Sequence, residues 1–559
     1  MSNPVAIVFI FVVLAMVYHG ITKNSKFIKK IRKEWETAEF LSPSEGFHSI
    51  SSYWSNRKRM SQGYDGVDQL TWEDLAMDDV FKKLNYTQST VGSEYLFNQL
   101  RDIDPRKEQC DEELYRLFAT DQKLRENILL ILSNLGKREY TDSSSFFFEL
   151  KHHEIKHAYL FGIFSLLPVA SILLLFFSLQ LGIAGLLGSL FLNAIIYYRH
   201  KTRLEHDLIS VGYAAAIIHA GKRIASLRHP SLLPYTSGLK ECVQPIKKVI
   251  AFNKITTLGS RSGGDFDVLF EYVRIFFLLD FISHNKIIKT ISTHQKEYRE
   301  VWERIGKLDA AIAVSFYRHS LDTYCTPTFT DMEELSFENM VHPLIEKAIP
   351  NTSHLGKCTL ITGSNASGKS TYIKAVAINA ILAQTINTVL AEKWTMMPSY
   401  IVTSMAIQDN VLNGDSYFIA EIKSLKRIID LVEKGKPCLS FIDEILKGTN
   451  TIERIAASAS MMEWLSLNKG MNVLATHDIE LTEIAVNMYT NYHFRETIVN
   501  GEVQFDYQVH SGPSVSRNAI KLLEITDYPT SITQKANQLA QHFSERRKWG
   551  VLRDHHPAR

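Results

Sequence analysis

One short run of residues has the types and spacing needed to hold a phosphate group. Residues Gly363 to Ser370, "GSNASGKS", fit the pattern G-x-x-x-x-G-K-[ST]. The glycines let backbone N–H groups turn inward around phosphate oxygens, Lys369 brings positive charge, and the Ser370 hydroxyl can ligate Mg²⁺. The run lies between the strand-like "CTLIT" and the helix-like "YIKAVAINAILAQ". A chance glycine turn is the alternative, but this placement favours a nucleotide-binding loop.

Two further runs could complete the chemistry of a nucleotide hydrolase. The apolar run "CLSFIDE" (438–444) ends in a carboxylate pair. Asp443 is expected to hold Mg²⁺ and Glu444 to polarise the attacking water. A second apolar run ends in "ATHD" (475–478), where His477 could sense the terminal phosphate. A solvated acidic turn and a structural histidine are the ordinary alternatives, and the loop upstream favours the functional interpretation.

The elements expected to position these residues follow from the hydrophobic spacing. After residue 330, short β-rich runs alternate with helical runs, which predicts a parallel sheet with crossover helices over 331–559. Residues 26–158 and 199–330 carry apolar side chains at helical spacing. Within the second region, 265–321 contains no proline, which predicts one long helix or a close helical pair with its aromatic side chains in the core.

Two stretches are apolar enough to suggest a membrane. Residues 159–198 contain no acid, base or histidine and predict a hairpin of two transmembrane helices, with its turn near 178–182. Residues 5–21 are uncharged and precede a basic run, which indicates an uncleaved anchor over 1–25. Buried soluble helices are the alternative for both. Basic flanks favour a multi-pass protein of the cell membrane with about three spans and a cytoplasmic C-terminal domain.

Composition excludes little. The formal net charge of +2 neither requires nor excludes a polyanionic partner. The five cysteines are far apart and form no C-x-x-C pair, so they fit neither a zinc site nor a disulfide framework. Reduced thiols suit a cytoplasmic location.

The three motifs, in this order and spacing, resemble the ATPase domain of the DNA mismatch-repair MutS family. "TGSNASGKSTY" resembles the phosphate loop of that family, "DEILKGTNT" (443–451) its acidic strand end, and "LATHDIELTEIA" (474–485) its histidine segment. "HPLIEKAIPN" (342–351) resembles the segment leading into the loop. Weaker similarity extends over 75–155 and 265–330.

The resemblance implies ATP and Mg²⁺ as cofactors and a homodimer as the working unit. "NGDSYFIAEIKSLKRI" (413–428) resembles the segment whose serine reaches the partner's nucleotide, a role that falls on Ser416; Asp415 and Tyr417 depart from that pattern. The implied catalytic residues are Glu444, His477 and Lys369, and the implied metal ligands are Ser370 and Asp443. The expected nucleotide contacts are Gly363, Ser364, Asn365, Ala366, Ser367, Gly368, Lys369, Ser370, Thr371 and Ser416.

The expected protein is therefore multi-domain, with membrane helices, an all-α core and lever region, and a C-terminal α/β P-loop NTPase domain. No mismatch-reading domain is expected before residue 75, which suggests a short, membrane-anchored branch of the family. DNA remains a candidate partner through "KKIRK" (29–33) and "SNRKRM" (55–60), which a solvated face also explains. The alternative is a nucleotide-switched membrane scaffold acting on an unknown protein partner. An ABC transporter is disfavoured because no L-S-G-G-Q run is present.

Overall fold

A computed structural model describes most of the chain. The described residues are 22–40, 50–60, 66–105, 111–139, 141–148, 155–256, 265–364, 367–405, 417–447, 449–499, 502–514, 519–526 and 528–546. The predicted anchor over 1–25 lies outside this part except for its last four residues. Asn365, Ala366 and Ser416 of the predicted nucleotide site also lie outside the described residues.

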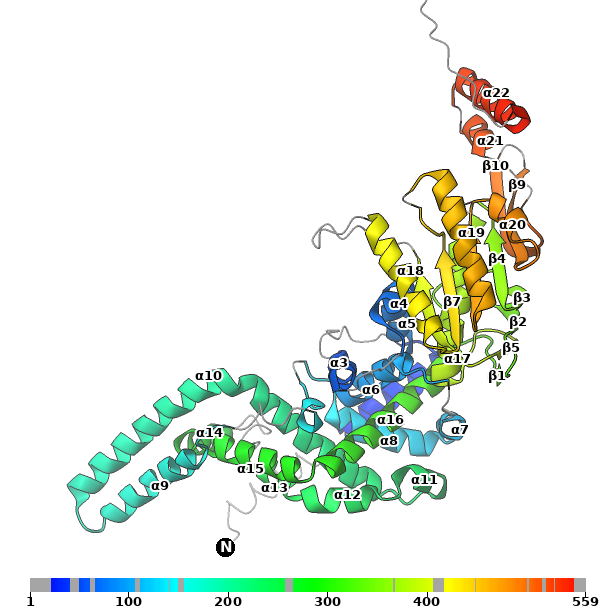
Figure 1. The fold of residues 1–559 in the computed structure, drawn as a ribbon. Helices are drawn as coiled ribbons and strands as arrows, with labels where there is room; N and C mark the ends of the chain where they lie inside the picture. Colours follow the sequence, from blue (N-terminus) through cyan, green and yellow to red (C-terminus); the bar gives the residue numbers. More distant parts are fainter. Residues whose placement is uncertain are drawn as a thin grey trace, which may run out of the picture.

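The N-terminal part is helical, as predicted. It contains a helix over 22–37 and then α3 (Ser52–Met60), α4 (Gln69–Asp74), α5 (Met77–Leu84), α6 (Thr90–Arg101), α7 (Glu112–Thr120) and α8 (Gln122–Leu135). A 3-10 turn, η1 (Ser145–Phe147), precedes a hairpin of α9 (Tyr159–Leu174) and α10 (Leu179–Ala225). This hairpin projects away from the rest of the molecule (Figure 1).

The chain returns from the hairpin through a second set of helices. These are η3 (Pro230–Leu232), α11 (Leu233–Thr236), α12 (Leu239–Ile246), α13 (Lys248–Thr256), α14 (Asp265–Phe276), α15 (Leu279–Thr293) and α16 (Gln295–His319). Residues 265–321 therefore form three helices, where one helix or a pair was predicted. The break between α14 and α15 falls at Leu278, which adopts a left-handed conformation with φ of 51°. A turn of this kind has no signature in hydrophobic spacing.

The C-terminal part is an α/β domain, which confirms the predicted fold class at this level. A six-stranded sheet has the order β10-β9-β4-β8-β7-β6, with β9, β4, β8, β7 and β6 parallel and β10 antiparallel. Its strands are β4 (Cys358–Thr362), β6 (Tyr400–Ser404), β7 (Cys438–Asp443), β8 (Met471–Thr476), β9 (Thr490–Val499) and β10 (Glu502–Ser511). A smaller sheet joins β1 (Thr328–Phe329), β2 (Leu335–Met340), β3 (Asn351–Leu355) and β5 (Lys393–Met396).

Helices cover both faces of the larger sheet. They are α17 (Lys369–Ile386) on one face, and α18 (Tyr417–Glu433), α19 (Thr451–Leu467) and α20 (Glu480–Ile484) on the other. The chain then continues into α21 (Ala519–Ile525) and α22 (Thr530–Arg546), which lie beyond the sheet in Figure 1. Alternate side chains of each strand point to opposite faces, so Ile361 packs in the cluster with α17 and Leu360 in the cluster with α18 and α19. Because side chains on both faces of the sheet are buried, the sequences of the central strands are continuous apolar runs.

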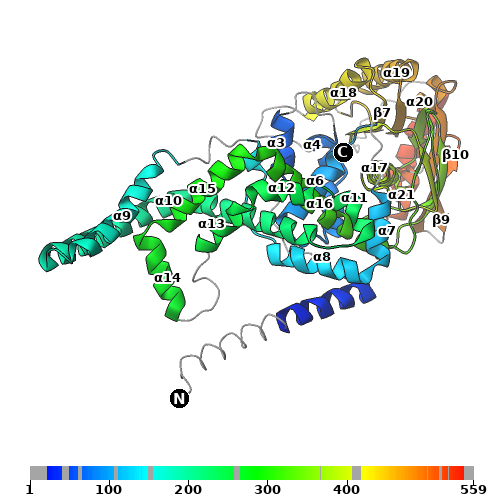
Figure 2. The ribbon, with the colours of Figure 1, turned by 90° about the horizontal axis from the view of Figure 1, so that it is seen from below.

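The helical part and the sheet domain meet closely. The helix α16 packs against α6, α7 and α12, and α17 of the sheet domain contacts α6. Figure 2 shows the same arrangement from below, with the hairpin and the sheet domain at opposite ends of the helical core. In the described part of the chain, these helices thus connect the sheet domain to the hairpin.

Candidate nucleotide site

The three predicted motifs meet at one edge of the larger sheet. The strand β8 lies between β4 and β7, with Thr362 paired to Thr476 and Asp443 paired to Ala475. Since these strands are parallel, their carboxyl ends lie together, and the residues that follow each strand face the same space. The loop after β4, the carboxylates after β7 and His477 after β8 are thus brought together as predicted.

The loop itself has the backbone that its glycines permit. Gly363 has φ of 142° and Gly368 has φ of 101°, conformations that residues with a Cβ seldom adopt. The helix α17 begins at Lys369, so Lys369, Ser370 and Thr371 occupy its first turn. This turn leaves backbone N–H groups directed toward the loop, which is the arrangement that favours an anion.

Lys369 is buried and folds back over the loop. Its Nζ donates to the carbonyl oxygens of Gly363 (2.6 Å) and Ser364 (2.8 Å), and only 2 % of the residue is exposed. Burial lowers the pKa of Lys369 to about 8, against the opposing effect of the nearby Asp443 carboxylate. The amine is therefore a desolvated cation that donates to two backbone carbonyls and lies 3.4 Å from Nδ1 of His477. These partners can be exchanged for phosphate oxygens.

Glu444 and His477 form a direct pair beside this loop. The Nε2 atom of His477 lies 2.8 Å from Oε1 of Glu444, and its Nδ1 lies 2.8 Å from the carbonyl oxygen of Gly363. The other carboxylate oxygen of Glu444 lies 3.0 Å from Nζ of Lys447. Burial, and then the charge of Lys369, lower the pKa of His477. His477 thus lies within hydrogen-bonding distance of both the candidate base and the loop, and its neutral ring donates to one of them at a time.

The backbone around Glu444 is unusual. Glu444 and Leu446 both have positive φ, 65° and 58°, and the N–H of Glu444 donates to the carbonyl of Ala475 (2.9 Å). Left-handed backbone at residues with a Cβ costs free energy and persists where the surroundings fix it. Here the turn directs the Glu444 carboxylate toward His477. Lys447 was not predicted as a site residue, because nothing in the sequence pattern shows which way this turn faces.

Ser364 and Ser367 contribute mainly to the shape of the loop. The hydroxyl of Ser364 donates to Glu496 of β9 (2.7 Å), and that of Ser367 donates to the Ser364 carbonyl (2.7 Å). The predicted metal ligands Ser370 and Asp443 are both partly exposed at the sheet edge. An oxygen-only pair of this kind, beside a loop shaped for phosphate, fits Mg²⁺ held jointly by protein and phosphate oxygens.

A cavity of about 320 Å³ lies next to the loop. Gly368 at the end of the loop and Thr371 and Tyr372 of α17 belong to its lining. The other lining residues are Met340, His342, Ile345, Lys347, Ala348, Ile349, Asn351, Ala375 and Tyr507. Tyr507 reaches this place through an irregularity in β10 between Phe505 and Val509, and its φ is 52°. Burial lowers the pKa of His342 to about 4, which keeps its ring neutral. The space suits a flat, mostly apolar group.

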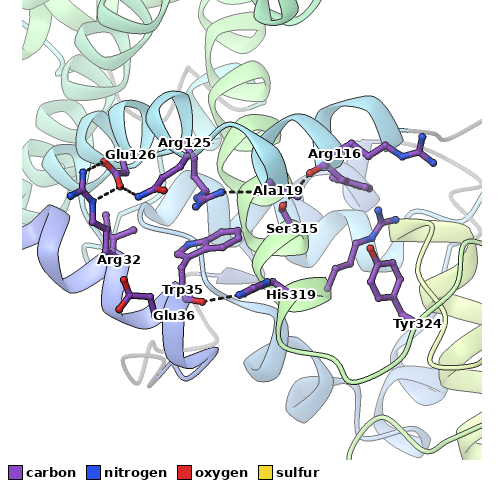
Figure 3. A pocket seen from close by; sticks show the side chains of 14 residues that line it. Arg32, Trp35, Glu36, Arg116, Ala119, Arg125, Glu126, Ser315, His319 and Tyr324 are labelled. Carbon is purple, nitrogen blue, oxygen red and sulfur yellow. Dashed lines mark hydrogen bonds and ion pairs between the residues drawn. The ribbon is translucent and has the colours of Figure 1, made fainter.

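A larger cavity of about 470 Å³ lies far from these motifs, at the junction of the 22–37 helix, α7, α8 and α16 (Figure 3). Its charged groups are largely paired with each other. Arg32 makes two hydrogen bonds to Glu126 (2.7 and 2.9 Å), and His319 Nε2 lies 2.7 Å from the carbonyl of Trp35. The guanidinium of Arg125 stacks on Trp35 and donates to the Ala119 carbonyl. These contacts describe a joint between helices rather than a reaction centre.

Comparison with known proteins agrees with the geometry. Residues 359–544 match the family model described as MutS domain V. This part of the chain is MutS-like. The chain is 28% identical over 279 residues to a DNA mismatch repair protein MutS of a Geobacillus species, covering 47% of this chain and 32% of that protein. A DNA mismatch repair protein MutS of Natronomonas pharaonis is 28% identical over 273 residues, covering 47% and 31%.

The similarity has a clear limit. A DNA mismatch repair protein MutS 2 of Haloarcula marismortui is 27% identical over 267 residues, covering 42% of this chain and 28% of that protein. The chain thus spans about a third of the length of the curated relatives that it matches. The MutS-like part contains the loop and both strand ends, so the predicted resemblance holds for the nucleotide site.

Proposed function

We propose that this protein is a membrane-anchored MutS-like ATPase that works as a homodimer and uses ATP to move its helical part. The observation that carries the proposal is the meeting of Lys369, Glu444 and His477 around the Gly363 carbonyl. A hydrolase needs a cation for the phosphates, a carboxylate for the water and a group that links the two. In this site His477 lies 2.8 Å from Glu444 and 3.4 Å from Lys369, and both His477 and Lys369 contact the Gly363 carbonyl.

Each residue has a definite role in this proposal. Lys369 leaves its carbonyl partners and binds the outer phosphates, while Ser370 and Asp443 hold Mg²⁺, which supplies charge stabilisation for phosphoryl transfer. Glu444 orients the attacking water and accepts its proton. His477 contacts both Glu444 and the loop, so it can report whether a terminal phosphate is present. The base of the nucleotide occupies the cavity between His342 and Tyr507.

The α9–α10 hairpin supports the membrane part of the proposal. One helix in the described part of the chain, Leu179–Ala225, is long and apolar enough to cross a membrane, and α9 is a shorter apolar helix. The apolar part of α10 buries small or polar residues, namely Gly182, Ser189, Asn193 and Tyr197. Its large side chains point outward, including Leu181, Leu187 and Phe191, which are 64–70 % exposed.

In a water-soluble hairpin, large apolar side chains are buried and polar residues are exposed; the apolar part of α10 has the opposite distribution. Small residues let two helices approach closely in a bilayer, and apolar side chains outside them meet lipid chains. Residues 179–198 of α10 would extend about 30 Å, which equals the thickness of the hydrocarbon core. The basic residues Arg199, Lys201 and Arg203 follow at once, as expected for the cytoplasmic side.

The same helix supports a mechanical role. The helix α10 continues from the apolar hairpin into the helical core, where it contacts α8, α12 and α16. At the other end of the core, Asp74 of α4 accepts hydrogen bonds from Thr403 Oγ1 (2.6 Å) and Met405 N (3.1 Å) at the end of β6. Arg427 of α18 bonds to Asp68, just before α4. A rearrangement at the end of β6 or in α18 would therefore be transmitted to α4 and the helical core through these hydrogen bonds.

DNA is the second candidate partner, because the matched relatives are named as mismatch-repair proteins. The basic runs that could touch phosphates are largely engaged within the chain. Arg57 bonds to Asp102 (2.7 Å), Lys58 lies over the Trp54 ring, and Arg32 bonds to Glu126. These contacts favour the alternative in which the ATPase acts on a protein or membrane partner.

The two possibilities can be separated by hydrolysis rates. The full-length protein in lipid nanodiscs would be assayed for ATP hydrolysis with and without duplex, mismatched and branched DNA, at low and physiological salt. Rates that do not respond to any DNA are the expected result. Salt-sensitive stimulation of ATP hydrolysis by one DNA structure would instead indicate that the ATPase acts on DNA.

A further inference from the structure

The helix α14 (Asp265–Phe276) has an apolar face that no other part of the described chain covers. On that face, Val268, Leu269, Tyr272 and Val273 are 53, 58, 53 and 37 % exposed. At 100° per residue these side chains fall within about 140° of the helix surface. Phe270, 40 % exposed, lies about 60° beyond one edge of this arc, and the exposed Glu271 lies about 60° beyond the other edge. The sequence predicted that the aromatic residues of this region belong to a core. That prediction is wrong for Phe270 and Tyr272 of α14, whereas Phe276 at its end packs against a core cluster.

The position of α14 relative to the hairpin is fixed by buried polar contacts. Asn193 of α10 donates through Nδ2 to the carbonyl of Phe276 (2.7 Å) and to that of Phe164 in α9 (3.0 Å). Tyr197 of α10 donates to Asp280 (2.8 Å), which also accepts two hydrogen bonds from Arg274 of α14. The end of α14 is thus attached at the base of the hairpin.

These contacts also fix the depth of α14. Asn193 lies six residues before Arg199, the first charged residue after the apolar stretch, which corresponds to about 9 Å along the helix. An amphipathic helix at a membrane surface buries its apolar face about 5–10 Å into the boundary between headgroups and acyl chains. The attachment point of α14 therefore matches the depth of an interfacial helix.

The direction of α14 agrees with this depth. Figure 2 shows α14 leaving the base of the hairpin crosswise to α9 and α10, and in Figure 1 it is foreshortened while the hairpin is seen along its length. A helix crosswise to a membrane-spanning hairpin lies in the plane of the membrane. Each of the three helices also carries an exposed tyrosine: Tyr159 at the start of α9, Tyr198 beside the basic end of the apolar stretch of α10, and Tyr272 in α14. Aromatic side chains gather at such interfaces.

We propose that α14 is an interfacial membrane helix that lies on the lipid surface beside the hairpin, with Val268, Leu269, Tyr272 and Val273 in the headgroup region. The inference rests on the proposed membrane location of the hairpin and adds a second type of lipid contact to it. Because α15 follows α14 after a single turn and leads into α16, the surface helix ties the return path of the chain to the bilayer.

The test uses full-length protein, with its native cysteines replaced, in vesicles of phosphatidylcholine and phosphatidylglycerol. Single cysteines at Leu269, at Glu271 and at Leu187 of the hairpin would carry an environment-sensitive fluorophore. Lipids with a nitroxide near the headgroup or near the chain end would act as quenchers. The expected result is blue-shifted emission at Leu269 quenched mainly by the shallow nitroxide, water-like emission at Glu271, and quenching at Leu187 mainly by the deep nitroxide.

The outcomes separate this inference from the proposed function. Water-like emission at Leu269 with lipid quenching at Leu187 would overturn the role of α14 and leave the hairpin in the membrane. Shielding of Leu269 from aqueous iodide without quenching by either lipid would also overturn it, because a protein surface would then cover α14. Absence of lipid quenching at Leu187 would overturn the membrane location itself, and the inference with it.

Discussion

At the scale of single residues, the proposed function makes phosphate binding depend on the charge of Lys369. Burial lowers its pKa to about 8, so the free site loses its cation as the pH rises through this value. A bound phosphate favours the protonated amine, so nucleotide binding takes up a proton in that range. The dissociation constant for ATP should be nearly constant below pH 8 and rise about tenfold per pH unit above it.

Binding of a fluorescent, non-hydrolysable ATP analogue between pH 6.5 and 9.5 would check this prediction. Lys369→Arg is the matched control, since a guanidinium stays charged throughout and should remove the rise even if it binds more weakly. A dissociation constant for the unaltered protein that stays flat to pH 9.5 would show that Lys369 is not the titrating group.

Much of the site could be predicted from the sequence because its motifs are short and each ends a strand. The order β4-β8-β7 then brings Lys369, Glu444 and His477 together. Two other parts could not be predicted. Tyr507 enters the adjacent cavity through an irregular strand, and Lys447 reaches Glu444 through a left-handed turn. Both depend on backbone conformations that residue types alone do not indicate.

At the scale of elements, the close approach of α9 and α10 depends on Gly182. A Cβ atom at Gly182 would lie 2.7 Å from backbone atoms of Leu175, whereas at Gly188 it would meet nothing within 4 Å. Gly182→Val should therefore separate the hairpin, and Gly188→Val should not. The expected loss for the first variant is about 1–3 kcal/mol, as for other overpacked sites.

The two glycine variants can be compared by thermal unfolding in the same detergent, followed by proteolysis of the hairpin turn. A lower midpoint and faster cleavage for Gly182→Val alone would agree with the packing. Equal behaviour of the two variants would contradict it, because both substitutions add the same side chain to the same helix.

A second element-scale prediction concerns the joint between the helical core and the sheet domain. Arg318, at the end of α16, is 6 % exposed and makes two hydrogen bonds to Glu112 of α7 (3.0 and 2.8 Å). It also bonds to Thr388, after α17 (2.8 Å). Arg318→Met removes these hydrogen bonds, while Arg116 and Asn387 continue to donate to Glu112, so the expected loss of stability is about 1–3 kcal/mol.

Unfolding of the Arg318→Met variant, compared with Arg318→Met/Glu112→Leu, would check this account. The double variant also removes the Glu112 carboxylate, which would be left with fewer partners, and should recover part of the lost stability. If the double variant is instead less stable than Arg318→Met by the full effect of Glu112→Leu alone, the ion pair does not stabilise the joint. Such a joint could not be predicted from sequence, because Glu112 and Arg318 lie on helices far apart in the chain.

At the scale of the whole molecule, the fold connects a nucleotide site to a hairpin through continuous helices. The helical and α/β parts were predictable from spacing, and so was the hairpin, although its turn lies at residues 175–178 and α10 extends to Ala225. The outward-facing α14 was not predictable, because a helix of this composition can cover a core or a membrane equally well. What decides between them is where the neighbouring helices place it.

The measurement that tests the central claim most directly is ATP hydrolysis by the full-length protein in nanodiscs, unaltered and as Glu444→Gln. The account predicts Mg²⁺-dependent turnover that falls about 10²–10⁴-fold in the variant, the range expected for a lost proton acceptor, while ATP binding persists. Turnover unchanged by Glu444→Gln would show that the residues gathered around Gly363 are not the catalytic site.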